Sequence, residues 1–125
     1  NGDGLADLVI GGMDKNVYVV YGKAKSSGVS VSATTIAPSN GFRIVTNQVD
    51  TTIGNTVSSA GDVNGDGLSD LVISGANAYV VYGNSTGSTV TIDTNGAIAP
   101  SSGFRIAVLA NYALSSSGDV NGHGL

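Results

Sequence analysis

The stretch Asp62–Asp70 contains the side chains best suited to chemistry. Asp62, Asn64, Asp66 and Asp70 stand at positions 1, 3, 5 and 9 of this stretch, and Gly67 stands at position 6. Short carboxylates and amides at alternate positions can turn inward onto one cation, and the glycine allows the sharp reversal that this requires. The spacing therefore predicts a calcium-binding loop.

The ligands of that predicted Ca²⁺ site are Asp62, Asn64, Asp66, the Leu68 carbonyl at position 7, and Asp70. The alternative is a loop without metal, in which the aspartate and asparagine side chains accept hydrogen bonds from nearby backbone groups as Asx turns. The presence of all four oxygen-bearing side chains together with the glycine favours calcium.

Shortened copies of the same loop lie at both ends of the chain. The N-terminal copy has no residue for position 1, and its candidate ligands are Asn1, Asp3, the Leu5 carbonyl and Asp7. The C-terminal copy ends before position 9, and its candidate ligands are Asp119 and Asn121.

The C-terminal copy has His123 at position 5, where imidazole nitrogen is a poor ligand for a cation that prefers oxygen. Two interpretations of the broken loops stay open. The two halves could combine into one split calcium site, within one chain or between chains. Alternatively, the chain is an excerpt of a longer array of repeats, and we favour this second interpretation.

The charge of the chain is concentrated in these loops. All nine acidic residues are aspartate, and the formal net charge is −4. Carboxylates this crowded repel one another unless a cation neutralises them. With five Lys and Arg residues and no basic cluster, nucleic acid is not an expected partner.

The sequence repeats itself with a period of about 62 residues. Residues 1–5 recur at 64–68, residues 17–22 recur at 78–83, and residues 36–44 recur at 98–106. The repeat predicts three segments: 1–55 as most of one structural unit, 56–111 as a second, and 112–125 as the first strand and partial calcium loop of the next.

Each repeat is expected to contain four short β-strands. In the second repeat the expected strands are 57–60, 71–74, 79–82 and 104–108, with a further strand-like run at 89–92, and 113–117 matches 57–60. Continuous apolar runs such as 7–11 are typical of strands covered on both faces. The predicted fold class is all-β: about two four-stranded antiparallel β-propeller blades, offset from the blade boundary and part of a larger propeller or assembly.

The stretch from Ser58 to Ile73, with Gly75-Ala76 and Tyr82-Gly83 after it, resembles FG-GAP repeats, the blades of integrin α-subunit propellers and of many bacterial extracellular proteins. The family's Gly-Ala-Pro is incomplete here, because Asn77 follows Gly75-Ala76. The resemblance implies a seven-bladed β-propeller, structural calcium between the first two strands of several blades, and partner binding by the opposite loops.

The expected function is therefore a calcium-stabilised extracellular propeller segment that acts as a non-catalytic adhesion, binding or structural scaffold. Its partners would be other blades and a protein or carbohydrate ligand. Secretion is implied by the resemblance alone. The sequence itself shows no signal peptide and no apolar run long enough to span a membrane. The alternatives are a self-assembling unit, ring or fibre, joined through its split loops, and a non-catalytic repeat region of a secreted hydrolase.

Catalysis by this chain is not expected. The only histidine, His123, has no nucleophile and acid to accompany it, and no cysteine is present.

Overall fold

The computed structural model describes residues 1–11, 14–24, 30–49, 52–108, 114–115 and 117. These residues form eight β-strands and no helix, so the described part of the chain has no helix that could cross a membrane. The strands are β1 (Leu8–Gly11), β2 (Asn16–Val20), β3 (Gly41–Thr46), β4 (Val57–Gly61), β5 (Asp70–Ile73), β6 (Ala78–Val81), β7 (Val90–Ile92) and β8 (Gly103–Ile106).

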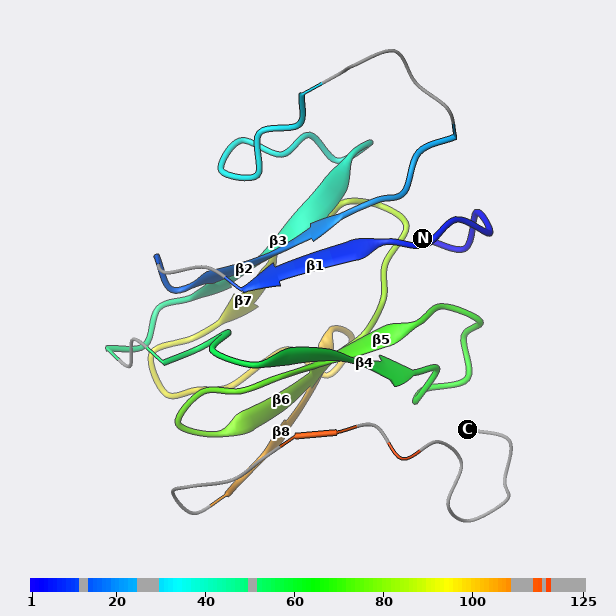
Figure 1. The fold of residues 1–125 in the computed structure, drawn as a ribbon. Coiled ribbons are helices and arrows are strands. Elements are labelled where there is room, and N and C mark those ends of the chain that lie inside the picture. The colour runs from blue at the N-terminus through cyan, green and yellow to red at the C-terminus, as the bar shows by residue number, and fades with distance from the viewer. Residues whose placement is uncertain (12–13, 25–29, 50–51, 109–113, 116, 118–125) are drawn as a thin grey trace.

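The strands form two four-stranded sheets, which lie one above the other in Figure 1. The second sheet has the order β4-β5-β6-β8, all of its neighbours are antiparallel, and all of its strands lie within residues 56–111. Runs of Val, Ile and Tyr favour the extended backbone of these strands, and a short turn connects β5 to β6. This sheet is the four-stranded blade that the sequence predicts.

The first sheet has the order β1-β2-β3-β7 and differs from this pattern in one strand. The strands β1, β2 and β3 pair antiparallel, but β7 pairs with β3 in the parallel direction. The strand-like run at 89–92 thus forms a strand of the second repeat that joins the sheet of the first repeat. β7 therefore takes the edge position beside β3 in the first sheet.

Two expected strands end differently from the prediction. The strand expected at 104–108 ends at Ile106. Of the strand expected at 113–117, the described residues are Leu114, Ser115 and Ser117, and none of them belongs to a strand.

The hydrophobic core lies between the two sheets. Side chains of the first sheet and of β7 pack against the facing side of β5 and β6, and the most completely buried of them are Val17, Ile44, Ile73, Tyr79, Val81 and Ile92. Apolar surface removed from water in this way is the main stabilising contribution to such a fold. The two repeats therefore stabilise each other through one shared face.

The outer faces of the two sheets also carry apolar side chains, and several of these are exposed. On the first sheet Leu8 is 60% exposed and Ile10 is 39% exposed, whereas Leu71 and Ile73, their counterparts in the second repeat, are 7% and 0% exposed. On the second sheet Phe104 and Ile106 are 38% and 42% exposed. Each exposed face corresponds by repeat position to a face that the core covers.

This asymmetry predicts unequal effects of two matched substitutions. Ile73→Ala removes a fully buried side chain and is expected to lower the free energy of unfolding by about 2–5 kcal/mol. Ile10→Ala, at the same place in the first repeat, is expected to cost far less, because that side chain is partly in water already. Urea unfolding of both variants in dilute solution measures the difference, and equal losses would contradict the burial described above.

Candidate metal centre

The loop between β4 and β5 is held together by its own aspartate side chains. The Oδ1 atom of Asp62 accepts hydrogen bonds from the backbone N–H groups of Gly65 and Asp66, at 2.7 and 3.1 Å, and its Oδ2 accepts one from Gly67 at 2.9 Å. Gly67 has φ +87°, a left-handed conformation that glycine adopts at little cost. The sequence predicts a sharp reversal at this glycine, and the loop does reverse at this point.

The second half of this loop has a hydrogen-bond pattern that the N-terminal copy repeats. The N–H of Asp66 donates to Asn64 Oδ1, the N–H of Leu68 donates to Asp66 Oδ1, and Asn64 Nδ2 donates to Asp66 Oδ2, at 2.8–3.0 Å. The same three bonds link Asn1, Asp3 and Leu5 at 2.9–3.2 Å. The half-loop therefore folds in the same way without a position 1 residue.

The bond from the Leu5 N–H also affects titration. It stabilises the charged carboxylate of Asp3 and, as the largest contribution, lowers the pKa of that side chain below its ordinary value.

Asp70 is the fully buried member of the loop, and it joins the loop to the sheet. Its Oδ2 accepts the N–H of Val63 at 2.7 Å, and its Oδ1 accepts the N–H of Gly83, just beyond β6, at 2.8 Å. In the first repeat Asp7 Oδ1 accepts the N–H of Gly22 at 2.8 Å in the same way. The aspartate at position 9 is thus a structural brace in both repeats.

The glycine of each brace allows a close approach of two backbone segments. A Cβ atom at Gly83 would lie 2.5 Å from the carbonyl oxygen of Ser69, and one at Gly22 would lie 2.3 Å from that of Ala6. Real Cβ atoms do not approach oxygen so closely. This is the physical reason for the recurring glycine just beyond β2 and β6.

Only some of the predicted ligands therefore lie together in the exposed loop. Asp62, Asn64 and Asp66 share one exposed loop, whereas both oxygens of Asp70 are engaged by backbone N–H groups. Within the described ranges no three Asp, Glu, His or Cys side chains form a cluster that could hold a metal ion. In the C-terminal copy, Asp119, Asn121 and His123 lie outside the described residues.

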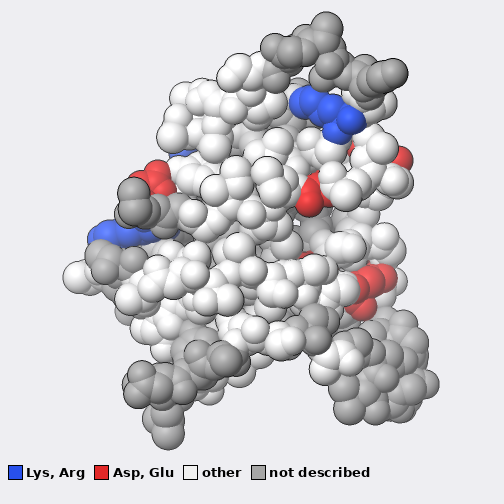
Figure 2. All heavy atoms as spheres, in the orientation of Figure 1, with Lys and Arg blue, Asp and Glu red and all other residues white. Residues whose placement is uncertain are grey.

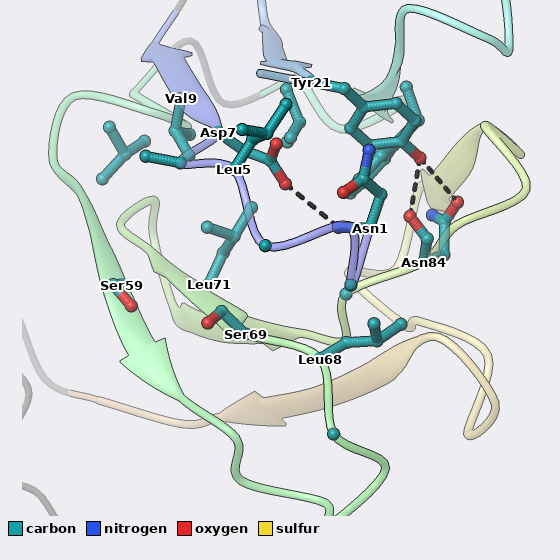
Figure 3. Close-up of a pocket in the computed structure, with 18 of the residues that line it drawn as sticks. Asn1, Leu5, Asp7, Val9, Tyr21, Ser59, Leu68, Ser69, Leu71 and Asn84 are labelled. Atoms are coloured by element: carbon teal, nitrogen blue, oxygen red, sulfur yellow. Dashed lines mark hydrogen bonds and ion pairs between the residues drawn. The ribbon is translucent and has the colours of Figure 1, made fainter. Parts of the chain in front are cut away.

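In the N-terminal copy the terminal ammonium donates to Asp7 Oδ2 at 3.0 Å, at the place where the Asn64 N–H approaches Asp70 Oδ2. The bond from Asn1 to Asp7 is drawn in Figure 3.

A cavity of about 520 Å³ lies between the two sheets at this loop end. Figure 3 shows Leu5, Val9 and Tyr21 on the side of the first repeat and Ser59 and Leu71 on the side of the second. Figure 2 shows acidic side chains at the end of the molecule where the two loops lie, and few charges elsewhere on that face.

Tyr21 ties the two repeats together beside the cavity. Its ring belongs to the shared core, and its hydroxyl donates to the backbone carbonyl of Asn84 at 2.6 Å (Figure 3). Burial raises the pKa of this phenol. Tyr21 and Tyr79 both lie in the core between the two sheets.

Sequence reasoning missed the brace, because an aspartate at position 9 of a loop motif is read as a metal ligand. The signal that could have revealed it is the joint recurrence of Asp7 with Gly22 and of Asp70 with Gly83. An aspartate needed only for metal would not require a glycine directly beyond the hairpin that follows it, as Gly22 follows β2 and Gly83 follows β6.

The brace predicts that Asp70→Asn destabilises the chain even when calcium is absent. The amide offers one acceptor oxygen in place of two, so one buried N–H loses its partner, which costs about 1–3 kcal/mol. Gly83→Ala should also destabilise, since the added methyl group meets the Ser69 carbonyl. Urea unfolding in EGTA measures both, and wild-type stability of Asp70→Asn under that condition would refute the structural role.

A family model described as FG-GAP-like repeat matches residues 1–73, which is more than half of the chain. Comparison with curated proteins and with solved structures gave no match. The matched region includes the whole first repeat, the β4–β5 loop and β5. Together with the two all-β sheets and the recurring loops, this match shows that the chain belongs to the FG-GAP repeat family, whose repeats are blades of propeller type.

Proposed function

We propose that this chain is a calcium-stabilised segment of an extracellular β-propeller, which serves as an adhesion, binding or structural scaffold and performs no chemistry of its own. The observation that carries the proposal is the loop between β4 and β5, in which Asp62, Asn64 and Asp66 present oxygen atoms on one exposed turn. The family assignment supports a scaffold built from repeated blades.

The donor chemistry of this loop suits calcium. Carboxylate and amide oxygens are the ligands that this hard cation prefers. The Oδ2 of Asp62 and both carboxylate oxygens of Asp66 each accept one hydrogen bond, so each retains a lone pair. The Leu68 carbonyl and Asp70 would complete the predicted set, with Asp70 also acting as the brace.

Calcium would act here as a counterion and would stabilise the conformation of the loop. It would offset the repulsion between the carboxylates of Asp62 and Asp66, and it would fix the turn that leads into β5. Because a bound ion stabilises only the folded state, its effect should appear as a shift of the unfolding equilibrium.

Calcium is therefore expected to raise the melting temperature relative to EGTA, with a stabilisation of about 2.7 kcal/mol at a calcium concentration 100-fold above Kd. Asp66→Asn should reduce this shift. Asp93→Asn is the matched control, because Asp93 also accepts backbone N–H groups in an exposed turn but belongs to no loop copy. Scanning calorimetry measures the shift, and identical melting curves in calcium and EGTA would sink the proposal.

A second candidate function, self-assembly into a ring or fibre, is favoured by the two exposed apolar faces. The face with Leu8 and Ile10 corresponds by repeat position to the covered face of the second sheet, and the face with Phe104 and Ile106 corresponds to the covered face of the first sheet. Two copies in line could therefore repeat the packing found inside one chain. Such a head-to-tail contact extends until it closes into a ring or continues as a fibre.

This candidate predicts reversible association that strengthens with protein concentration and with calcium, which would join the split loops. Ile10→Lys and Phe104→Lys should each weaken it. Val49→Lys is the control, because Val49 is equally apolar and 91% exposed but lies outside the strands. Sedimentation velocity over a range of concentrations provides the measurement, and an equal effect of all three variants would argue against association through the blade faces.

A further inference from the structure

An asparagine followed by a glycine lies in the exposed part of the β4–β5 loop, at Asn64 and Gly65. At such a pair the protein backbone readily attacks the side-chain amide, because glycine has no Cβ to shield its nitrogen. We propose that Asn64 is a site of deamidation, and that Asp62 protects it by holding the N–H of Gly65. This role of Asp62 is independent of the proposed calcium site.

The reaction at Asn64 needs only water as a co-reactant. The backbone nitrogen of Gly65 loses its proton to solvent and bonds to Cγ of Asn64, which closes an imide ring. The bond from Cγ to Nδ2 then breaks, and the Nδ2 group takes up a proton and leaves as ammonia. Water opens the ring at one or the other of its carbonyl carbons. One product is aspartate at position 64, and the other is isoaspartate, in which the main chain runs through Cγ.

Both reacting groups are engaged in hydrogen bonds in the folded loop. The N–H of Gly65 donates to Asp62 Oδ1 at 2.7 Å, so the nitrogen must give up a charge-assisted hydrogen bond before it can attack. The negative charge of the Asp62 carboxylate also opposes removal of the proton. On the other group, Asn64 Oδ1 accepts the N–H of Asp66 at 3.0 Å, and Nδ2 donates to Asp66 Oδ2 at 2.8 Å. These two bonds hold the side-chain amide in one orientation.

The N-terminal copy of the loop contains the same pair without the protecting aspartate. Asn1 Oδ1 accepts the N–H of Asp3 at 3.2 Å, and Asn1 Nδ2 donates to Asp3 Oδ2 at 2.9 Å, as at Asn64. The glycines also match, since Gly2 and Gly65 both have φ +78°. Within the described part of the chain the Gly2 N–H makes no hydrogen bond, because this copy has no residue at position 1. The two pairs therefore differ at the acceptor for the glycine N–H.

Deamidation would change both the charge and the length of the loop. Either product places a further carboxylate between Asp62 and Asp66, and these like charges repel one another. Isoaspartate also adds an atom to the main chain within the stretch whose N–H groups bond to Asp62. Protection of Asn64 therefore preserves the hydrogen-bonded form of the loop.

Two extended chains test the acceptor by adding it where it is absent. A copy of residues 57–63, which contain β4 and the position 1 aspartate, is placed before Asn1, and in the second chain alanine replaces the aspartate of that copy. Deamidation in EGTA is followed by peptide mass spectrometry. The rate at Asn1 should be at least about tenfold lower with the aspartate than with the alanine, because a hydrogen bond to a charged group is lost in the second chain. Equal rates at Asn1 would overturn the proposal.

Asp62→Ala removes the acceptor where it is present, and it should raise the rate at Asn64 at least about tenfold. Asn95, which is followed by Gly96, provides the internal reference. It belongs to no loop copy, and the N–H of Gly96 donates to the backbone carbonyl of Asp93 at 3.0 Å. The rate at Asn95 should not change. An unchanged rate at Asn64 in the folded variant would contradict the role of Asp62.

The reference also identifies a damaged fold. If Asp62→Ala unfolds the chain, Asn64 and Asn95 accelerate together, and the two extended chains then decide. A further measurement needs no variant: Asn64 of the unmodified chain should react more slowly in buffer than in guanidinium chloride. Equal rates under these two conditions would overturn the proposal, because the folded loop would then give no protection.

Discussion

The packing of one apolar sheet face against another is the interaction on which this structure depends. Each sheet is thin, and its strands are apolar on both sides, so neither sheet has an interior of its own. The inner faces meet through Val17, Ile44, Ile73 and Tyr79 and remove these side chains from water. The outer faces are also apolar, and part of each is exposed, at Leu8 and Ile10 on the first sheet and at Phe104 and Ile106 on the second. Repeats of this kind gain stability from neighbouring blades, because each blade cannot bury both of its faces alone.

The loop end of the stack is organised by carboxylates that accept backbone hydrogen bonds. Asp70 and Asp7 connect the start of one strand to the glycine beyond the next, and this connection fixes where each loop begins. Asp62 and Asp66 hold the exposed part of the loop in Asx turns. The Asx-turn geometry and the calcium hypothesis are compatible, because the turns orient the same oxygen atoms that a cation would bind. Within this one short motif, the brace connects the loop to the sheet, and the proposed ion site lies in the exposed part of the loop.

Much of this arrangement follows from local sequence. The repeat period and the runs of Val, Ile and Tyr predict the strands of the second sheet, and the spacing of aspartates predicts a loop that reverses at Gly67. The partner of β7 could not be predicted, because an alternating run shows that one face of a strand is buried but not which sheet edge it joins. The role of Asp70 was missed for a related reason. An aspartate that accepts two backbone N–H groups cannot be told from an aspartate that binds a cation by residue type alone.

The central claim is that the apolar side chains exposed on β1 and β8, Leu8, Ile10, Phe104 and Ile106, are covered by a neighbouring blade. Amide hydrogen exchange, resolved by residue at low and high protein concentration in calcium, tests this most directly. The account predicts that amides of β1 and β8, whose outer faces carry exposed apolar side chains, exchange more slowly at high concentration, while amides in the already covered β5 and β6 keep their rates. Exchange on β8 that does not depend on concentration would contradict it.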